Sequence, residues 1–134
     1  MALHHWGVRQ CLHTTFILDH LGKPDIKQRQ LDSWQANLRK LAELPNVACK
    51  ISGIVTEADH NRWQPADLEP FVNVALESFG EDRVLFGSDW PVVLLASSYY
   101  YWYKTLQTLT TRLPLAARHK LWAENAQCLY RMSK

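Results

Sequence analysis

The chain has 134 residues, of which 47% are hydrophobic and 21% charged, and its formal net charge is +2. This length suits one domain with a real core, and the near balance of charge, without a basic stripe, argues against nucleic-acid binding. No apolar stretch approaches the ~20 residues that span a bilayer, and residues 1–10 lack the charged-then-apolar order of a secretory signal. We therefore expect a cytoplasmic protein with neither a membrane nor a nucleic-acid partner.

The cysteines add a second indication of location. Cys11, Cys49 and Cys128 form no CxxC pair, and their number is odd. This pattern favours buried free thiols in a reducing cytoplasm over disulfides or metal ligands.

Short apolar runs predict three strands along the chain. Residues 14–18 are β-branched and apolar, and they end in a loop marked by a glycine and a proline. Residues 47–52 and 83–87 have the same character, and polar residues follow each of them. Helical periodicity between the runs makes this the strand–helix alternation of a parallel α/β sheet.

The helices are predicted from apolar spacing and from their end signals. The first is capped by Asp32 or Ser33 and buries a stripe formed by Trp34, Leu38, Leu41 and Ala42. The second starts near Pro65, ends at Gly80 and buries Leu68, Phe71, Val72, Ala75, Leu76 and Phe79. Residues 98–132 predict two or three further helices, with Pro114 between them.

Polar side chains gather where the predicted strands end, which is where parallel α/β folds bind ligands. They are Asp19, His20, Lys50, Ser52, Ser88 and Asp89. With strands about 4.8 Å apart, His20 and Asp89 lie about 10 Å apart at the backbone. Inward-leaning side chains can then hold one substrate or metal between them. By pattern alone, a simple role in capping the turn after the strand fits His20 and Asp89 as well as a role in a site does.

Four motifs in order carry a resemblance to a known family. Residues 16–24 (FILDHLGKP), 50–53 (KISG) and 83–91 (RVLFGSDWP) resemble the sixth-, seventh- and eighth-strand motifs of lactonases in the amidohydrolase superfamily, fuconolactonase-like and pyrone-dicarboxylate-lactonase-like. Glu124-Asn125-Ala126, with Leu129-Tyr130, resembles their closing helix.

The resemblance implies an α/β fold that is the C-terminal portion of a TIM-type (β/α)8 barrel, about strands six to eight with their helices. Residues 1–134 then form a single partial-barrel domain. Residues 1–13 are the end of a preceding helix, and residues 14–134 are the last three βα units and the closing helices. A complete barrel typically takes ~250 residues.

The resemblance also implies residue roles. His20 contacts the substrate or a metal, and Asp89 activates the hydrolytic water and touches the metal in metal-bearing members. Lys50 and Ser52 are weaker candidates for contacting the substrate, joined by His60 in the loop after the second strand and by Trp90. The implied cofactor is one divalent, zinc-like metal ion held by His20 and Asp89, with metal-independent hydrolysis as the alternative.

One departure from the family pattern is plain. The family's first strand carries a His-x-His pair, and this chain has none. His4 and His5 are adjacent and directly precede the sixth-strand motif, so we expect them on the outer helical layer. Substrate-binding residues from strands one to five are also absent.

Two functions follow as hypotheses. In the first, the chain is a hydrolase that opens a sugar lactone, or a related cyclic ester or carboxylate substrate, by water attack on the carbonyl, and it supplies only part of the active site. In the second, it is an inactive remnant that acts by oligomerising or by pairing with another chain. Both predict a poor catalyst in isolation. Unpaired outer strands and the aromatic run at residues 99–103 also predict a homo-oligomer, or association with a complementing N-terminal half-barrel.

Overall fold

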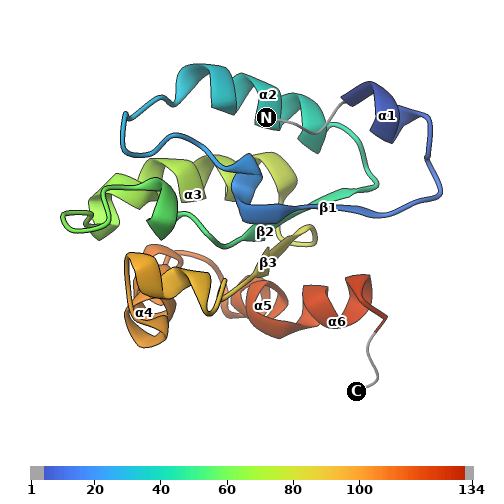
Figure 1. The fold of residues 1–134 in the computed structure, drawn as a ribbon. Helices are drawn as coiled ribbons and strands as arrows, with labels where there is room; N and C mark the ends of the chain where they lie inside the picture. Colours follow the sequence, from blue (N-terminus) through green and yellow to red (C-terminus); the bar gives the residue numbers. More distant parts are fainter. Residues whose placement is uncertain (1–4, 132–134) are drawn as a thin grey trace.

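The computed structural model describes residues 5–131, with the side chains of residues 7–131, and shows an α/β fold around a parallel three-stranded sheet (Figure 1). Strands β1 (Phe16–Leu18), β2 (Val47–Ile51) and β3 (Val84–Phe86) are neighbours in chain order. The predicted alternation of strands and helices is therefore confirmed. Each strand is shorter than its predicted run: β1 starts two residues later, β2 ends one residue earlier, and β3 loses one residue at each end.

The helices follow the strands in the predicted order. They are α1 (His5–Arg9), α2 (Asp32–Ala42), α3 (Pro65–Phe79), α4 (Tyr99–Leu109), α5 (Leu115–His119) and α6 (Asn125–Leu129), with a π-helical turn, η4 (Lys120–Glu124), between the last two. Shorter 3₁₀ turns are η1 (Asp19–Gly22), η2 (Val55–Glu57) and η3 (Val92–Leu95). Helices α2 and α3 lie together beside β1 and β2, whereas η4 and α6 lie against β3 (Figure 1).

The core lies on one face of the sheet, between the strands and the pair α2–α3. Side chains alternate between faces along a strand, and the register puts Leu18, Cys49 and Val84 together in the hydrophobic core. Every residue predicted to be buried on the first two helices is buried, with Val74 as an addition. The other face of the sheet carries Lys50, which is the register partner of Leu85 on β3. The polar residues at the strand ends adjoin this face.

The ends of the two long helices differ in how far sequence signals determine them. Helix α3 begins at Pro65 as predicted, and Gln64 and Asp67 form a reciprocal capping box at this end. At its other end the helix stops at Gly80, also as predicted. Helix α2 has Leu31 at its N-cap and no side-chain cap. The predicted cap was therefore wrong, because Asp32 is already the first helical residue.

Two expectations about exposure need correction. Cys49 is a buried free thiol whose pKa is raised far above its ordinary value by burial, but Cys11 and Cys128 are exposed, so three buried thiols were wrongly expected. Within the aromatic run, Trp102 is buried in the core while Tyr99, Tyr100 and Tyr101 are exposed. Trp102 lies on the face of α4 that packs inward. Its position within a run of tyrosines does not indicate this in the sequence.

None of the helices within residues 5–131 has both the length and the apolarity that a membrane crossing requires. Helix α1 begins at His5, and the expected outer placement of the His4 and His5 side chains lies outside the described residues.

Arg83 ties the start of β3 to the end of α2. Its guanidinium donates to the carbonyls of Ala42, Leu44 and Val47 at 2.8–2.9 Å. The same group lies over the Phe79 ring, 5.4 Å from its centroid. Because these carbonyls belong to a helix end and the strand after it, one side chain joins two consecutive βα units.

Arg83→Met should lower the free energy of unfolding by about 2–3 kcal/mol, since it removes charged hydrogen bonds from three carbonyls while keeping an apolar stem. Urea denaturation followed by circular dichroism measures this loss. Arg112→Met is the matched control, because Arg112 bonds Asn73 on an exposed surface, and its loss should stay within about 0.5 kcal/mol. Equal losses in the two variants would contradict the role of Arg83.

Candidate functional site

A hollow of about 430 Å³ opens at the carboxyl ends of the three strands. It is lined by Asp19, His20, Lys50, Ser52, Leu85, Phe86, Gly87, Ser88, Asp89, Ala126 and Tyr130. All six of the polar residues expected at the strand ends are therefore in one place.

The imidazole of His20 and the carboxylate of Asp89 meet in this hollow. Nε2 of His20 lies 3.6 Å from Oδ1 of Asp89, and both side chains are largely but not fully covered. The expectation that the two side chains share one site is confirmed by this distance. Both residues also have left-handed backbone, with φ of 54° and 56°. Such conformations are uncommon away from glycine and gather at functional sites.

Ser52 holds the other side of the same ring. Its Oγ lies 2.7 Å from Nδ1 of His20. The order Ser52–His20–Asp89 resembles that of a nucleophile, a base and an acid, but Ser52 is only 1% exposed and cannot meet a substrate directly. Its hydroxyl instead holds the ring in place, because a hydrogen bond at Nδ1 fixes the orientation of the imidazole and turns Nε2 toward Asp89.

Two glycines make this close approach possible. A Cβ built on Gly53 would lie 2.6 Å from Cγ and Nδ1 of the His20 ring. A Cβ on Gly87 would lie 2.8 Å from Cβ of Ser52 and 2.9 Å from Cδ of Lys50. The presence of glycine in the KISG and FGSD motifs is therefore explained by sterics, because a larger residue would leave no room for the side chains of the site.

Lys50 forms a second polar group in the hollow. Its ammonium lies 3.0 Å from Oδ1 of Asp19 and 5.7 Å from the centre of the Tyr130 ring. Burial alone would lower the pKa of Lys50, but the hydrogen bonds to Tyr130 and Asp19 outweigh it and raise the pKa above its ordinary value. Lys50 is therefore a fixed cation, suited to holding an anionic or hydroxyl-bearing group.

Two residues expected to contact the substrate lie elsewhere. His60 is exposed, and its Nε2 lies 2.8 Å from the Thr56 carbonyl instead of lining the hollow. Trp90 is 65% exposed and follows Asp89 outside the lining. Asp19 was expected at this edge of the sheet but without a role in the site, and Tyr130 was not expected there. Only the tertiary packing of α6 shows that the end of the closing helix reaches Lys50.

The metal expected from the resemblance can be tested against the donors present. Zinc takes three or four protein ligands at about 2.0–2.3 Å. A separation of 3.6 Å between Nε2 of His20 and Oδ1 of Asp89 suits two such ligands. Within residues 5–131, however, no group of three or more His, Cys, Asp or Glu side chains is placed to hold a metal. The described residues alone therefore do not complete a zinc site.

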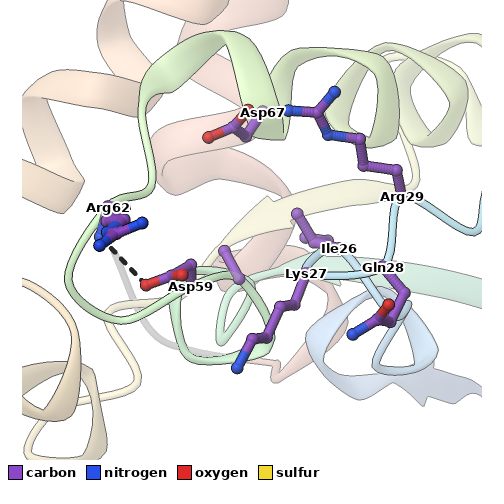
Figure 2. Close-up of a pocket in the computed structure, with 8 residues that line it drawn as sticks. Ile26, Lys27, Gln28, Arg29, Asp59, Arg62 and Asp67 are labelled. Atoms are coloured by element: carbon purple, nitrogen blue, oxygen red, sulfur yellow. Dashed lines mark hydrogen bonds between the residues drawn. The ribbon is translucent and has the colours of Figure 1, made fainter.

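A second hollow, of about 270 Å³, lies between the loop after β1 and the loop after β2 (Figure 2). Its carboxylates already serve the backbone: Asp59 accepts from the Arg62 amide, and Asp67 accepts from the Gln64 amide. In Figure 2 the Arg29 side chain reaches toward Asp67, Arg62 lies beside Asp59, and Lys27 extends in a third direction. These side chains do not converge on a common point, so this hollow carries no chemistry comparable to that of His20 and Asp89.

Comparison with known proteins gives the family. Residues 8–132 match the family model described as amidohydrolase. The chain belongs to the amidohydrolase family. It is 43% identical over 124 residues to the L-fucono-1,5-lactonase of Burkholderia multivorans (strain ATCC 17616 / 249), a match that covers 85% of the chain and 42% of that enzyme. The resemblance inferred from the four motifs is thereby confirmed.

Two further amidohydrolase relatives show the same partial coverage. The 2-pyrone-4,6-dicarboxylate hydrolase of Comamonas testosteroni is 34% identical over 94 residues, which is 64% of the chain and 30% of that enzyme. A crystal structure of a Burkholderia multivorans amidohydrolase with bound zinc superposes with a TM-score of 0.87 at 35% identity, over 99% of this chain and 52% of that one. The chain thus spans less than half the length of the two curated relatives.

Gly53→Ala should break the contact between His20 and Ser52, because the new methyl group occupies the space of the imidazole. A His20→Ala background is the matched control, because the new methyl group then has no imidazole to meet while the backbone strain at Gly53, with a φ of 63°, is the same. Gly53→Ala should lower the free energy of unfolding by about 1–3 kcal/mol more in the unsubstituted chain than in the His20→Ala background, measured by urea denaturation. Equal losses in the two backgrounds would mean that His20 is not held against Gly53.

Proposed function

We propose that this chain supplies the proton-handling part of the active site of a lactone hydrolase. It contributes about strands six to eight, with their helices, of an eight-stranded (β/α)8 barrel. The observation that carries the proposal is the meeting of His20 and Asp89, 3.6 Å apart, in a hollow at the carboxyl ends of parallel strands. Relatives named as a lactonase and as a pyrone-dicarboxylate hydrolase support the same chemistry.

The residue types fit hydrolysis of a cyclic ester. Asp89 accepts the proton of a water molecule as its oxygen attacks the ester carbonyl carbon. The imidazole of His20 polarises the carbonyl oxygen, on which negative charge develops. The bond from carbonyl carbon to ring oxygen then breaks, the ring oxygen takes up the proton that Asp89 accepted, and a hydroxy acid leaves. Ser52 acts through His20 by holding its ring.

The same hollow favours a polar, hydroxyl-bearing substrate such as a sugar lactone. Lys50 is fixed as a cation beside Asp19, and Tyr130 adds an aromatic wall with a hydroxyl. These groups suit the hydroxyls of the lactone and the carboxylate of the product. His60 and Trp90 stay proposed contacts for parts of a substrate that extend beyond the hollow, because both are exposed.

A divalent, zinc-like metal is proposed with His20 and Asp89 as two of its ligands. The zinc in the Burkholderia multivorans structure supports a metal in the family. When bound, such an ion polarises a carbonyl or lowers the pKa of water. Since the described residues offer only two ligands, the others must come from outside them, and hydrolysis without a metal stays the alternative.

The assay uses L-fucono-1,5-lactone with the chain alone, and with the chain mixed with the part of the Burkholderia multivorans lactonase that it does not match. We expect little turnover alone, because positioning and electrostatic stabilisation from the other strands are absent. Turnover in the mixture should fall about 10²–10⁴-fold with Asp89→Asn. Asp82→Asn, a surface carboxylate paired with Lys120, should leave it unchanged. Full activity of the Asp89→Asn mixture would refute the proposal.

A mixture that stays inactive with the unsubstituted chain would favour the second hypothesis, an inactive remnant that pairs with other chains. The sheet edges give this alternative its physical basis. Among the described residues, β1 and β3 each pair only with β2. Asn125 covers part of the β3 edge by donating to the Val84 carbonyl at 2.8 Å. Within residues 7–131, no side chain is bonded to the outer edge of β1 in this way.

We predict that the 134-residue chain self-associates through the outer edge of β1, as a homo-oligomer that stands in for a complementing half-barrel. The Phe16 amide donates inward to Asn46, so the Ile17 amide points outward. Ile17→Pro removes that outward donor and should shift the protein toward monomer in sedimentation at micromolar concentration. Ile17→Ala, which keeps the donor, should stay associated. A monomeric unsubstituted chain would contradict the prediction.

A further inference from the structure

The loops that carry His20 and Asp89 are each held by a buried tryptophan from the helical layer. The Trp34 indole Nε1–H donates to the carbonyl of Leu21, directly after His20, at 2.7 Å. The Trp102 indole Nε1–H donates to the carbonyl of Gly87, two residues before Asp89, at 2.9 Å. Trp34 is in α2, which follows β1, and Trp102 is in α4, which follows β3. Each helix therefore bonds back to the loop that follows its own strand.

These loops need such support because their backbone is in a sparsely populated conformation. His20, Leu21, Gly22 and Lys23 all have positive φ, as does Asp89 in the other loop. Non-glycine residues hold this conformation only where the surroundings impose it. At the first loop, the surroundings are the fully buried Leu21 side chain and the indole bonded to its carbonyl.

The two indoles are themselves rigid. Trp34 packs against Phe71, with ring centroids 5.2 Å apart, and Trp102 stacks on Phe86 at 6.4 Å. Both are buried, at 7% and 1% exposure, so neither can exchange its bond for one to bulk water. Through these indoles, the packed helices hold the carbonyls of Leu21 and Gly87 in place beside the site residues.

We propose that Trp34 and Trp102 are positioning residues, whose indole N–H groups set the relative placement of the His20 imidazole and the Asp89 carboxylate. The role of that pair in hydrolysis rests on the proposed function, but its geometry does not. The inference therefore predicts that deleting either N–H disorders the pair even when the ring and its packing are kept.

The chain offers a matched control. Trp63 donates from its indole Nε1 to the Ala96 carbonyl at 2.7 Å, a bond of the same kind and length. Trp63 also packs against an aromatic ring, that of Tyr101, at 5.0 Å. The Ala96 carbonyl is adjacent to neither His20 nor Asp89. Substitutions at all three tryptophans thus remove an equivalent bond. Trp34 and Trp102 bond within two residues of a site residue, whereas Trp63 bonds to the far end of the segment between β3 and α4, seven residues after Asp89.

The experiment replaces each tryptophan in the 134-residue chain with 3-benzothienylalanine, which keeps the ring shape and lacks the N–H, and with phenylalanine as the genetic variant. Nitrogen-15 NMR of the His20 ring reports its state, because a ring held by Ser52 shows well-separated Nδ1 and Nε2 shifts and a released ring shows averaged ones. Circular dichroism and thermal melts establish that each variant is folded. None of these readouts depends on turnover, so failure of the lactonase assay leaves the test intact.

Changes at Trp34 and Trp102 should at least halve the separation between the two ring-nitrogen shifts, whereas the change at Trp63 should leave it as in the unsubstituted chain. Ser52→Ala gives the reference for a released ring. If a phenylalanine variant fails to fold, the benzothienyl variant decides the matter. Folded variants at Trp34 and Trp102 with unchanged ring shifts would overturn the inference, as would an equal effect at Trp63.

Discussion

One imidazole joins the ends of all three strands. His20 follows β1, its Nδ1 contacts Ser52 after β2, and its Nε2 faces Asp89 after β3. This arrangement follows because the strands are parallel and neighbours in the sheet, which brings their carboxyl ends to one edge. The fold and the site are therefore aspects of the same constraint, which is to bring three successive loops within reach of one ring.

Meeting that constraint requires local departures from ordinary structure. The strand-end loops run through left-handed conformations at His20 and Asp89, and Gly53 and Gly87 give up side chains to leave room. The remainder of the chain offsets these departures. Arg83 ties consecutive βα units together, and α2 and α3 bury a continuous core on the far face of the sheet. The site thus lies beside a closely packed core, which resists small displacements of a side chain.

The features of the fold that could be predicted are those that depend on a repeating pattern in the sequence. The buried stripe of α3 was predicted residue by residue, because a 3.6-residue period acts along the whole helix. The polar strand ends were predicted too, since a run of apolar residues must stop at a turn. Features decided by distant contacts were missed: the exposure of Cys11 and Cys128, the inward face of Trp102, and the arrival of Tyr130 beside Lys50. No local pattern records which face a short, all-aromatic run turns toward the core.

The charges of the hollow bear on how the proposed hydrolysis would be divided among its residues. The Lys50 ammonium is already paired with Asp19 at 3.0 Å, whereas Asp89 has the His20 ring beside it at 3.6 Å. In the proposed reaction Asp89 takes the proton of water, and His20 offers one donor to the oxyanion that forms at the ester carbonyl. A single donor stabilises an oxyanion less than a cation or a set of donors aimed at it. If the chain works as part of a (β/α)8 barrel, as proposed, the remaining stabilisation has to come from an electropositive group outside the described residues, whether a metal with its ligands or basic side chains.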